Sequence, residues 1–384
     1  MFTSDLIEKL NQHSTPFYYY DLDLLERNLQ TLQEASQAYG YKVHYALKAN
    51  VDERILQRIR EYGFGADCVS GNEVRKALEV GFPASDIVFA GVGKTDQEIQ
   101  FAIRNNIHSL NCESLQELEV INALSQQMNR VAPVSLRLNP GLDARTHQYI
   151  TTGLEGNKFG ISQVELESIL KNLHQFTHIN IIGLHFHIGS QITDLEVFRE
   201  LCQVVNAIQE KFAAYPLQLS HLNLGGGLGI DYYHPDENPI PDYHAFFQVF
   251  QESLKPLPQQ TIHFELGRAV VAQCGALISR VTYVKRGLNT RFVILDAGMT
   301  ELIRPALYHG YHKIQNLTSS EPSRVYDVVG PVCESADFFG KGVELPETRR
   351  GDLIAIRSVG AYGQVMASRY NLRDPARVIY SDQI

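Results

Sequence analysis

With 384 residues, 44% of them hydrophobic and 20% charged, the chain is long enough to bury the cores of two or more domains. A net charge of −9 argues against nucleic acid as a partner, and no run approaches the ~18 apolar residues of a membrane span or forms a signal peptide. Five cysteines without a CxxC pair argue against a disulfide framework or a thiolate metal site, so we expect a cytoplasmic protein that needs no metal.

The pattern of apolar segments predicts a strand at Phe17–Tyr20, a helix at Leu22–Ala38 and then a repeated alternation of strands and helices. The predicted strands end near Lys48, Asp67, Gly91, Asn111, Arg137, His187, Gly225 and Glu265. The predicted helices are Glu53–Tyr62, Asn72–Val80, Thr95–Asn105, Ser114–Gln127, Gln163–Leu173, Asp194–Phe212 and Tyr243–Leu254. Eight such units within about 220 residues are typical of a (β/α)8 TIM-type barrel, with a doubly wound sheet as the alternative. We prefer the barrel because chemically suggestive residues recur at the strand ends, which a barrel gathers on one face.

From about Val270 onward the pattern changes to strands without long helices, at Ala276–Val284, Phe292–Leu295, Arg324–Val329 and Asp352–Ile356. These segments predict a separate β domain, either a barrel or a sandwich. The early strand Phe17–Tyr20 lies outside the eight barrel units and is expected to pair with this β domain. The predicted fold class is therefore α/β, with a barrel domain at 22–269 and a discontinuous β domain made of 1–21 and 270–384.

Lys48 follows an apolar strand-like run and precedes Ala49 and Asn50, which suit the end of a strand. A lysine in this position is expected to have a buried stem and an amine held in a cleft. Burial lowers the pKa of a lysine and frees its amine as a nucleophile, which is what an imine-forming lysine needs.

Two segments near later strand ends suit a phosphate ligand. His185 and His187 lie two residues apart and hence on one face of a strand, but no third ligand is spaced to complete a zinc site. Ser190, just beyond them, offers a hydroxyl group. The glycine-rich turn Gly225–Gly229 follows the seventh predicted strand, and loops after strands 7 and 8 are a common phosphate site in such barrels.

The end of the eighth predicted strand carries Glu265 and Arg268, an acid and a base three residues apart. An ordinary salt bridge is one interpretation. The other is that the carboxylate faces a pyridine nitrogen, keeps it protonated and so makes the ring an electron sink. The β domain adds groups suited to a polar substrate, namely Arg304, Tyr308, Cys333, Glu334 and Tyr362.

Seven segments, in this order, resemble the diaminopimelate decarboxylase family, whose members are pyridoxal-phosphate enzymes with the fold of alanine racemase and ornithine decarboxylase. They are Tyr45–Asn50, His185–Gln191, Gly225–Gly229, Glu265–Arg268, Asp296–Tyr308, Gly330–Asp337 and Gly360–Gly363. The resemblance extends from about Thr15 to Asn371. Leu266 stands where most members have proline, and Thr300-Glu301 stands where Asn-Asp is usual.

This resemblance implies a role for each of the residues singled out above. Lys48 would bind pyridoxal 5'-phosphate covalently, and Cys333 would be the proton donor. The other cofactor-binding residues would be Asp67, His187, Ser190, Gly225, Gly226, Gly227, Glu265, Gly267, Arg268 and Tyr362. The substrate would be held by Arg268, Arg304, Tyr308, Glu334 and Tyr362.

We therefore expect decarboxylation of meso-2,6-diaminopimelate to L-lysine and CO2, the last step of lysine biosynthesis. The distal amino-acid head of this substrate needs a cation for its carboxylate and an anion for its ammonium, and Arg268 or Arg304 with Glu334 would supply both. The alternatives are a decarboxylase of ornithine, arginine or carboxynorspermidine, an amino-acid racemase, and a non-catalytic pyridoxal-phosphate carrier. A racemase needs a second base where we expect Cys333, and the carriers resemble the barrel alone. The resemblance also implies a homodimer in which the partner's loop completes each active site.

Overall fold

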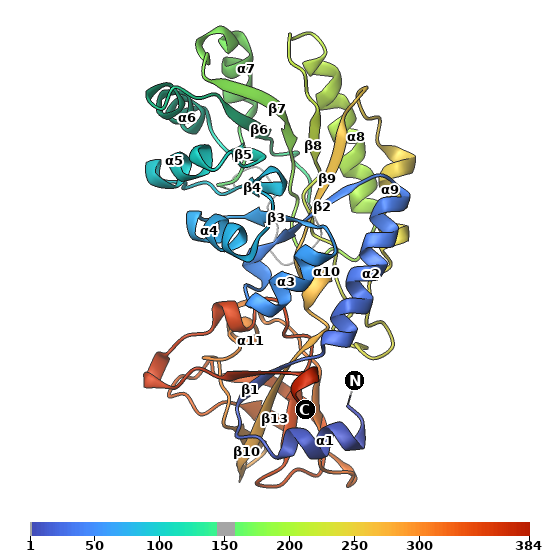
Figure 1. Cartoon of the computed structure of the whole chain (residues 1–384). Coiled ribbons are helices and arrows are strands. Elements are labelled where there is room, and N and C mark those ends of the chain that lie inside the picture. The colour runs from blue at the N-terminus through green and yellow to red at the C-terminus, as the bar shows by residue number, and fades with distance from the viewer. Residues whose placement is uncertain (1, 144–157) are drawn as a thin grey trace. The chain divides into compact units, whose positions relative to one another are not determined.

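The computed structural model describes residues 2–143 and 158–384 of the chain (Figure 1). The chain forms two compact units. The barrel unit consists of Leu29–Gly229 and Asp242–Gly267, and the sheet unit of Met1–Asn28, Ile230–Pro241 and Arg268–Ile384. The domain boundaries expected from the sequence stay a prediction, although Ile230–Pro241, inside the expected barrel domain, is grouped with the sheet unit.

Eight parallel strands close into a barrel in the order β2 to β9. They are β2 (Lys42–Ala46), β3 (Gly65–Cys68), β4 (Ile87–Phe89), β5 (Ser109–Cys112), β6 (Ala132–Arg137), β7 (Ile179–His185), β8 (His221–Asn223) and β9 (Thr261–Leu266). Every strand ends within two residues of its predicted end. Because β2 also pairs with β9, from Lys42↔His263 to Tyr45↔Leu266, the sheet has no edge. The predicted barrel is confirmed, and the doubly wound alternative is wrong.

Helices alternate with the barrel strands along the chain. They are α2 (Leu22–Ala38), α3 (Glu53–Glu61), α4 (Gly71–Val80), α5 (Asp96–Arg104), α6 (Leu115–Gln127), α7 (Gln163–Lys171), α8 (Glu196–Phe212) and α9 (Tyr243–Ser253). Most of them begin at a side chain that accepts a hydrogen bond from a first-turn amide, a role filled by Asp52, Ser70, Thr95, Ser114, Ser162 and Asp242. Such caps satisfy amide groups that have no partner within the helix and so define where each helix starts.

The sheet unit contains an eight-stranded, mostly antiparallel sheet. Its strands are β1 (Phe17–Tyr20), β10 (Gly275–Arg286), β11 (Arg291–Leu295), β12 (Ile314–Asn316), β13 (Ser323–Val329), β14 (Phe338–Pro346), β15 (Leu353–Ile356) and β16 (Arg377–Tyr380). Strand β1 pairs with β10 in antiparallel and with β16 in parallel orientation, which confirms that the N-terminal strand joins the β domain. The unit also contains α1 (Ser4–Asn11), α10 (Arg268–Val271) and α11 (Arg304–Tyr308).

One hydrophobic cluster explains why the two ends of the chain meet in the sheet unit. Phe17 and Tyr19, two residues apart on β1, pack with residues of α1, β10 and β15. The buried members are Leu10, Phe17, Tyr19, Ala276, Ile278, Leu353 and Ala355. Burial of this side of β1 against strands more than 250 residues later in the chain supplies the non-directional driving force for that pairing.

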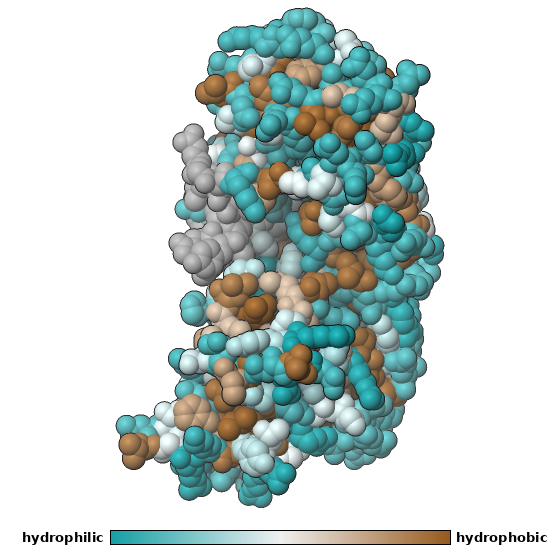
Figure 2. Space-filling model, turned by 90° about the vertical axis from the view of Figure 1, so that its left-hand side faces the viewer, coloured by the Kyte–Doolittle hydropathy of each residue, from teal (hydrophilic) through white to brown (hydrophobic). Residues whose placement is uncertain are grey.

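None of the described helices is long and apolar enough to cross a membrane. On the face drawn in Figure 2, hydrophobic residues occur in small groups between hydrophilic ones.

Candidate active site

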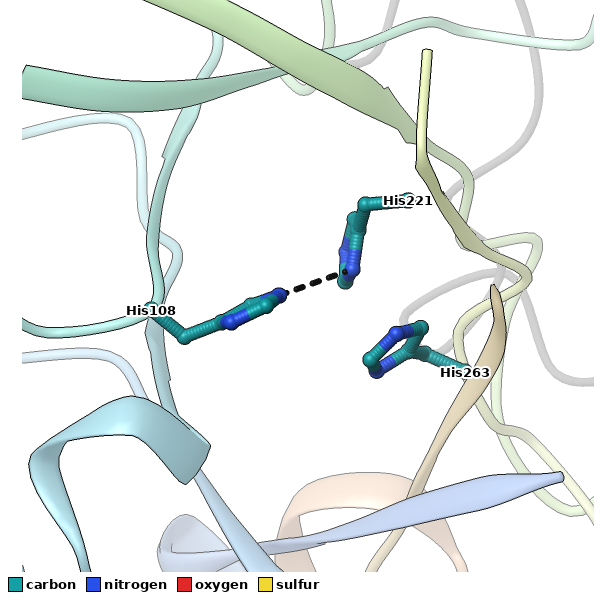
Figure 3. A group of neighbouring side chains, drawn as sticks. All are labelled: His108, His221 and His263. Carbon is teal, nitrogen blue, oxygen red and sulfur yellow. Dashed lines mark hydrogen bonds between the residues drawn. The ribbon is translucent and has the colours of Figure 1, made fainter. Parts of the chain in front are cut away.

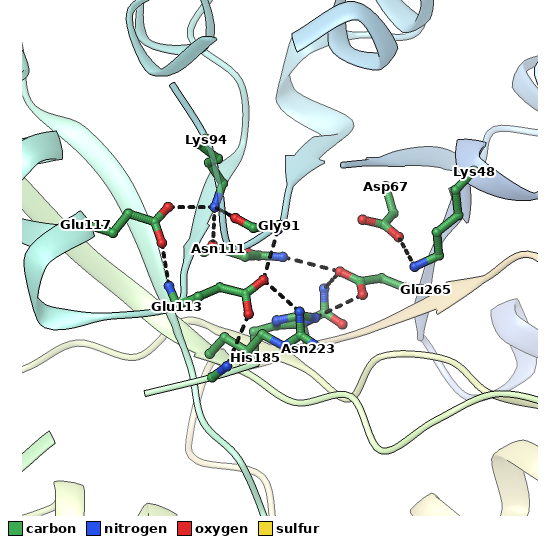
Figure 4. A network of polar contacts seen from close by, with 12 residues as sticks. Lys48, Asp67, Gly91, Lys94, Asn111, Glu113, Glu117, His185, Asn223 and Glu265 are labelled. Atoms are coloured by element: carbon green, nitrogen blue, oxygen red, sulfur yellow. Dashed lines mark hydrogen bonds and ion pairs between the residues drawn. The ribbon is translucent and has the colours of Figure 1, made fainter. Parts of the chain in front are cut away.

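Lys48 lies just beyond the carboxyl end of β2, in a short 3-10 turn (Leu47–Ala49). Its Nζ is 4.0 Å from Oδ2 of Asp67 on the neighbouring strand β3 (Figure 4). The Lys48 side chain is 39% exposed, whereas the Asp67 side chain is 1% exposed. The Lys48 side chain is thus partly buried, and the burial of its stem stays a prediction. The amine faces a buried carboxylate from a partly open position.

Asp67 is a buried carboxylate with unused hydrogen-bonding capacity. Its Oδ1 has no hydrogen-bond partner among residues 2–143 and 158–384. Burial, followed by the nearby charge of Glu265, raises the pKa of Asp67 well above its ordinary value, and Lys48 opposes this shift. A buried polar atom without a partner is costly, so this oxygen is suited to accept a hydrogen bond from a bound ligand.

Glu265, on β9, is the centre of a buried polar network inside the barrel (Figure 4). Its Oε1 accepts hydrogen bonds from Nδ2 of Asn223 at 2.7 Å and from Nδ2 of Asn111 at 3.3 Å. Its Oε2 lies 2.9 Å from Nε2 of His185. The three partners come from the carboxyl ends of β5, β7 and β8, which a closed barrel brings together.

The surroundings of Glu265 keep it ionised although it is buried. Burial alone would raise its pKa, but the charge and hydrogen bond of His185, followed by His187 and Lys48, lower it below the ordinary value. The two buried carboxylates therefore differ, with a lowered pKa at Glu265 and a raised pKa at Asp67. Two neighbouring buried acids with opposite pKa shifts are typical of a functional site.

His185 and His187, the two histidines of the sixth predicted strand, contact different partners. His185 is the last residue of β7 and contacts Glu265, whereas His187 lies beyond the strand end. Nδ1 of His187 accepts a hydrogen bond from the Gly226 amide at 3.3 Å. Burial, then Lys48 and Arg137, hold the pKa of His187 well below its ordinary value, so its ring is neutral with the proton on Nε2.

The glycine turn after β8 packs backbone against backbone. A Cβ atom at Gly226 would lie 1.7 Å from the carbonyl oxygen of Glu265, so no side chain fits there. Gly225 has a φ of +68° and donates its amide hydrogen bond to Oδ1 of Asn223 at 2.9 Å. Two of the three predicted phosphate-binding amides, those of Gly225 and Gly226, thus have partners within the protein.

Two further predicted cofactor-binding residues lie elsewhere in the chain. Ser190 follows His187 by three residues, and Gly267 follows Leu266 at the end of β9.

Two ion pairs lie near the carboxyl ends of β4, β5 and β6, beside the Glu265 network (Figure 4). Nζ of the buried Lys94 donates to the carbonyl oxygens of Gly91 and Asn111, at 2.8 Å each, and to Oε1 of Glu117 at 2.6 Å. Nη1 of Arg137 lies 2.7 Å from Oε1 of Glu113. Because every charge here has a hydrogen-bonded partner, the network stabilises the loop ends without leaving an unpaired buried ion.

A second group of predicted residues lies together in the sheet unit. Nη1 of Arg268 donates to the hydroxyl of Tyr232 at 2.5 Å, and the Arg268 guanidinium lies 4.9 Å from the ring centre of Tyr362. The Arg304 guanidinium lies 5.0 Å from the ring centre of Tyr232. Tyr308 follows on the same short helix as Arg304. Two guanidinium groups among phenol rings form a site for an anionic head group.

His312 fixes the orientation of Arg304, a contact that the sequence pattern did not indicate. Its Nδ1 lies 2.7 Å from the carbonyl oxygen of Arg357, so Nδ1 carries the proton, and Nε2 accepts from Nη1 of Arg304 at 2.6 Å. Burial, then the charge of Arg304, lower the pKa of His312 well below its ordinary value. The sequence pattern also did not indicate Tyr232. This residue lies in Ile230–Pro241, a segment that belongs to the sheet unit although it stands between two segments of the barrel unit in the sequence.

Cys333 and Glu334 lie exposed on the loop between β13 and β14. The backbone amide of Cys333 donates to Oδ1 of Asn371 at 3.0 Å, and Oε1 of Glu334 accepts from the Ser335 amide at 2.9 Å. Buried Asp337 anchors the loop by accepting from the Val332 and Met299 amides at 2.6 Å each. Among the described residues, no hydrogen bond joins Cys333 or Glu334 to the arginine and tyrosine group.

The barrel residues fit pyridoxal phosphate. Lys48 offers an amine at a strand end, and Glu265 offers a buried ionised carboxylate suited to a ring nitrogen. His187 offers a neutral imidazole. Asp67 offers a second carboxylate, whose Oδ1 has no hydrogen-bond partner in the described part of the chain. The sequence pattern assigned no role to Asn111, His185 or Asn223; the signal that could have done so is their position at the carboxyl ends of barrel strands.

Comparisons with known proteins agree with this fit. A family model for the pyridoxal binding domain of pyridoxal-dependent decarboxylases matches residues 22–272. The chain is 52% identical to a diaminopimelate decarboxylase of Bacteroides thetaiotaomicron, over 98% of each chain. It is 40% identical to that of Neisseria meningitidis serogroup B, over 96% of this chain and 88% of the relative. A crystal structure of diaminopimelate decarboxylase from Helicobacter pylori complexed with L-lysine has a TM-score of 0.91 and 41% identity, covering 97% of this chain and 93% of that one. The chain therefore belongs to the diaminopimelate decarboxylases, a family of pyridoxal-dependent decarboxylases.

Proposed function

We propose that this protein converts meso-2,6-diaminopimelate to L-lysine and CO2 with pyridoxal phosphate, as the last step of lysine biosynthesis. The observation that carries the proposal is the ionised Glu265, buried in the same barrel as the Lys48–Asp67 pair, in a chain 52% identical to a diaminopimelate decarboxylase. We also propose a cytoplasmic location, in keeping with five cysteines that are all free thiols.

Each barrel residue then has a task toward the cofactor. When bound, pyridoxal phosphate supplies an electron-withdrawing ring that takes up the electron pair left as CO2 departs. Lys48 would hold the cofactor covalently, and Glu265 would keep a proton on its ring nitrogen. The neutral ring of His187 is suited to lie against the cofactor ring, and Asp67 to accept a hydrogen bond from it. Ser190, Gly225, Gly226, Gly227 and Gly267 would hold the phosphate group.

The sheet-unit residues bind the substrate and return a proton. Arg268, Arg304 and Tyr308 bind carboxylate groups, Glu334 binds the distal ammonium, and Tyr362 touches both substrate and cofactor. The bond between the α-carbon and its carboxylate breaks, and the thiol of Cys333 gives its proton to that carbon. A substrate such as ornithine lacks the distal carboxylate and would gain nothing from two arginines.

Product analysis tests the proposal directly. Purified protein loaded with pyridoxal phosphate is expected to release L-lysine and CO2 from meso-diaminopimelate in equal amounts. Ornithine, arginine and carboxynorspermidine serve as the comparison substrates. Faster turnover of any of these three, or racemisation without release of CO2, would contradict the proposal.

Arg304→Ala is expected to lower kcat/KM for diaminopimelate by roughly 30- to 1000-fold, because a charge-assisted contact with a carboxylate is lost. Arg304 is 6% exposed and held by His312, so its guanidinium is oriented before the substrate binds. Arg291→Ala, at an exposed arginine of the same unit, is the matched control and should leave kcat/KM unchanged. Undiminished activity of Arg304→Ala would remove this arginine from the site.

We further propose that two chains form a two-fold dimer with shared active sites, in which Cys333 and Glu334 serve the partner's Lys48. If the inactive variants Lys48→Ala and Cys333→Ala exchange subunits, about half of the dimers are hybrids by random pairing. One site of a hybrid then carries both defects and the other carries neither. Activity should recover to about a quarter of wild type by the same two-fold counting. Proven exchange without recovery would place both residues in the site of one chain.

A further inference from the structure

Four histidines gather inside the barrel on the side of Glu265 that faces the amino ends of the strands. His44 lies on β2, His221 begins β8, His263 lies on β9, and His108 immediately precedes β5. His221 lies two residues before Asn223 on β8, and His263 lies two residues before Glu265 on β9. Side chains two residues apart on a strand point to the same side, so both histidines point into the barrel, closer to the amino ends of the strands than Glu265. They are 1% and 2% exposed, and His108 is partly exposed.

Burial lowers the pKa of all four imidazoles. Burial lowers the pKa of His44 to about 4, and burial followed by the other histidines lowers the pKa of His221 and of His263 well below the ordinary value. The pKa of His108 is lowered first by burial and then by Lys42. A neutral imidazole keeps one nitrogen lone pair, which is the form that binds a metal ion.

A hydrogen-bonded chain determines which nitrogen of His263 carries its lone pair. Nδ1 of His44 lies 3.0 Å from the carbonyl oxygen of Asp86, which only accepts, so this nitrogen carries the proton. Nε2 of His44 therefore accepts, and Nδ1 of His263, 2.8 Å away, must donate to it. Nε2 of His263 is left as the lone-pair nitrogen. Metal-bound histidines are oriented in this way, by donating the other ring N–H to an acceptor behind them.

The remaining two rings complete a three-nitrogen cluster (Figure 3). Nε2 of His108 and Nδ1 of His221 form a hydrogen bond of 3.1 Å, whose single proton a cation bound to both nitrogens would displace, and one nitrogen from each of His108, His221 and His263 lies within 4.8 Å of the other two. Ligand nitrogens around tetrahedral zinc, with bonds of about 2.0 Å, are separated by about 3.3 Å. Nε2 of His221 is buried without a hydrogen-bond partner in the described part of the chain.

We propose that His108, His221 and His263 form a binding site for a zinc-class divalent cation, with His44 as the positioning residue behind His263. Three imidazoles suit Zn2+, Co2+ or Ni2+ and leave a fourth position for water. The charged groups that act on these histidines are Lys42, which opposes a cation, and Asp86 and Glu265, which favour one. A cavity of about 210 Å³ lined by Lys42, His44 and Asp86 lies beside the positioning residue, and His108 is the partly exposed member of the three ligands.

Titration of the metal-free holoenzyme with Co2+ tests this site, because tetrahedral Co2+ absorbs visible light at longer wavelengths than the cofactor. We expect one Co2+ per chain with the absorption of a tetrahedral nitrogen site, displaced by Zn2+. The variants His108→Gln and His221→Asn are expected to bind at least about 100-fold more weakly, and His44→Phe about 10- to 100-fold more weakly. Saturating Zn2+ should raise Tm by about 5 °C in the wild type and not in His221→Asn.

His234→Gln is the matched control, because His234 is an exposed histidine outside the cluster, and this variant should bind Co2+ like the wild type. Cofactor-held Co2+ or Co2+ on the exposed thiol of Cys333 would persist in His108→Gln and His221→Asn. The proposal would be overturned if Co2+ binding persisted in these two variants, or if the folded wild-type holoenzyme did not bind Co2+ stoichiometrically. The four histidines would then be a hydrogen-bonded part of the barrel core.

Discussion

Lys48→Ala is expected to lower kcat by about 1000-fold or more, because the chain loses the amine that holds the cofactor covalently. The protein should remain folded, since the replaced side chain is 39% exposed and leaves no cavity. Borohydride reduction of the wild type followed by mass spectrometry should show the cofactor attached to the peptide that contains Lys48. The variant should show no attached cofactor anywhere in the chain.

Two other lysines make this test specific. Lys94 also lies beside the network, but its ammonium donates to Gly91, Asn111 and Glu117 and is not available for attachment. Lys42 is exposed at the start of the same strand as Lys48, so Lys42→Ala is the matched control and should retain activity and borohydride labelling. Labelling that survives in Lys48→Ala would show that another lysine carries the cofactor.

Glu265→Gln is expected to lower kcat by about 100- to 1000-fold, equivalent to about 3–4 kcal/mol of transition-state stabilisation. An amide carries no charge with which to keep a ring nitrogen protonated. It would also turn its NH2 group toward Asn111, Asn223 or His185, which all donate hydrogen bonds to the carboxylate. The measurement is kcat together with the pH dependence of the cofactor absorption, whose midpoint should shift in the variant.

A second buried carboxylate provides the comparison for Glu265. Glu113 pairs with Arg137 and accepts from the Gly91 amide at 2.9 Å, so Glu113→Gln removes a buried charge without touching the contacts of Glu265. This variant should melt at a lower temperature while its cofactor absorption keeps the wild-type midpoint. If both variants shift the midpoint equally, the effect belongs to buried charge in general and not to Glu265.

Much of the architecture was predictable because its signals are local. Alternating apolar segments and turn residues predicted the ends of the barrel strands and the bounds of the helices that follow within two residues, since each element buries its own apolar face. The strands β12, β14 and β16 of the sheet unit were not predicted. They are short, or run over a partly exposed surface, so their burial patterns lack a clear period.

The sequence by itself determined the fold class, the family and the list of candidate residues, because these depend on short patterns and their order along the chain. Only the tertiary structure decided that Glu265 is ionised while the pKa of Asp67 is raised, and that His312 orients Arg304. It alone brings His108, His221 and His263 together from positions spread over 150 residues. A charge state and a ligand geometry depend on distances between side chains that are remote in sequence, and these distances exist only once the barrel has closed.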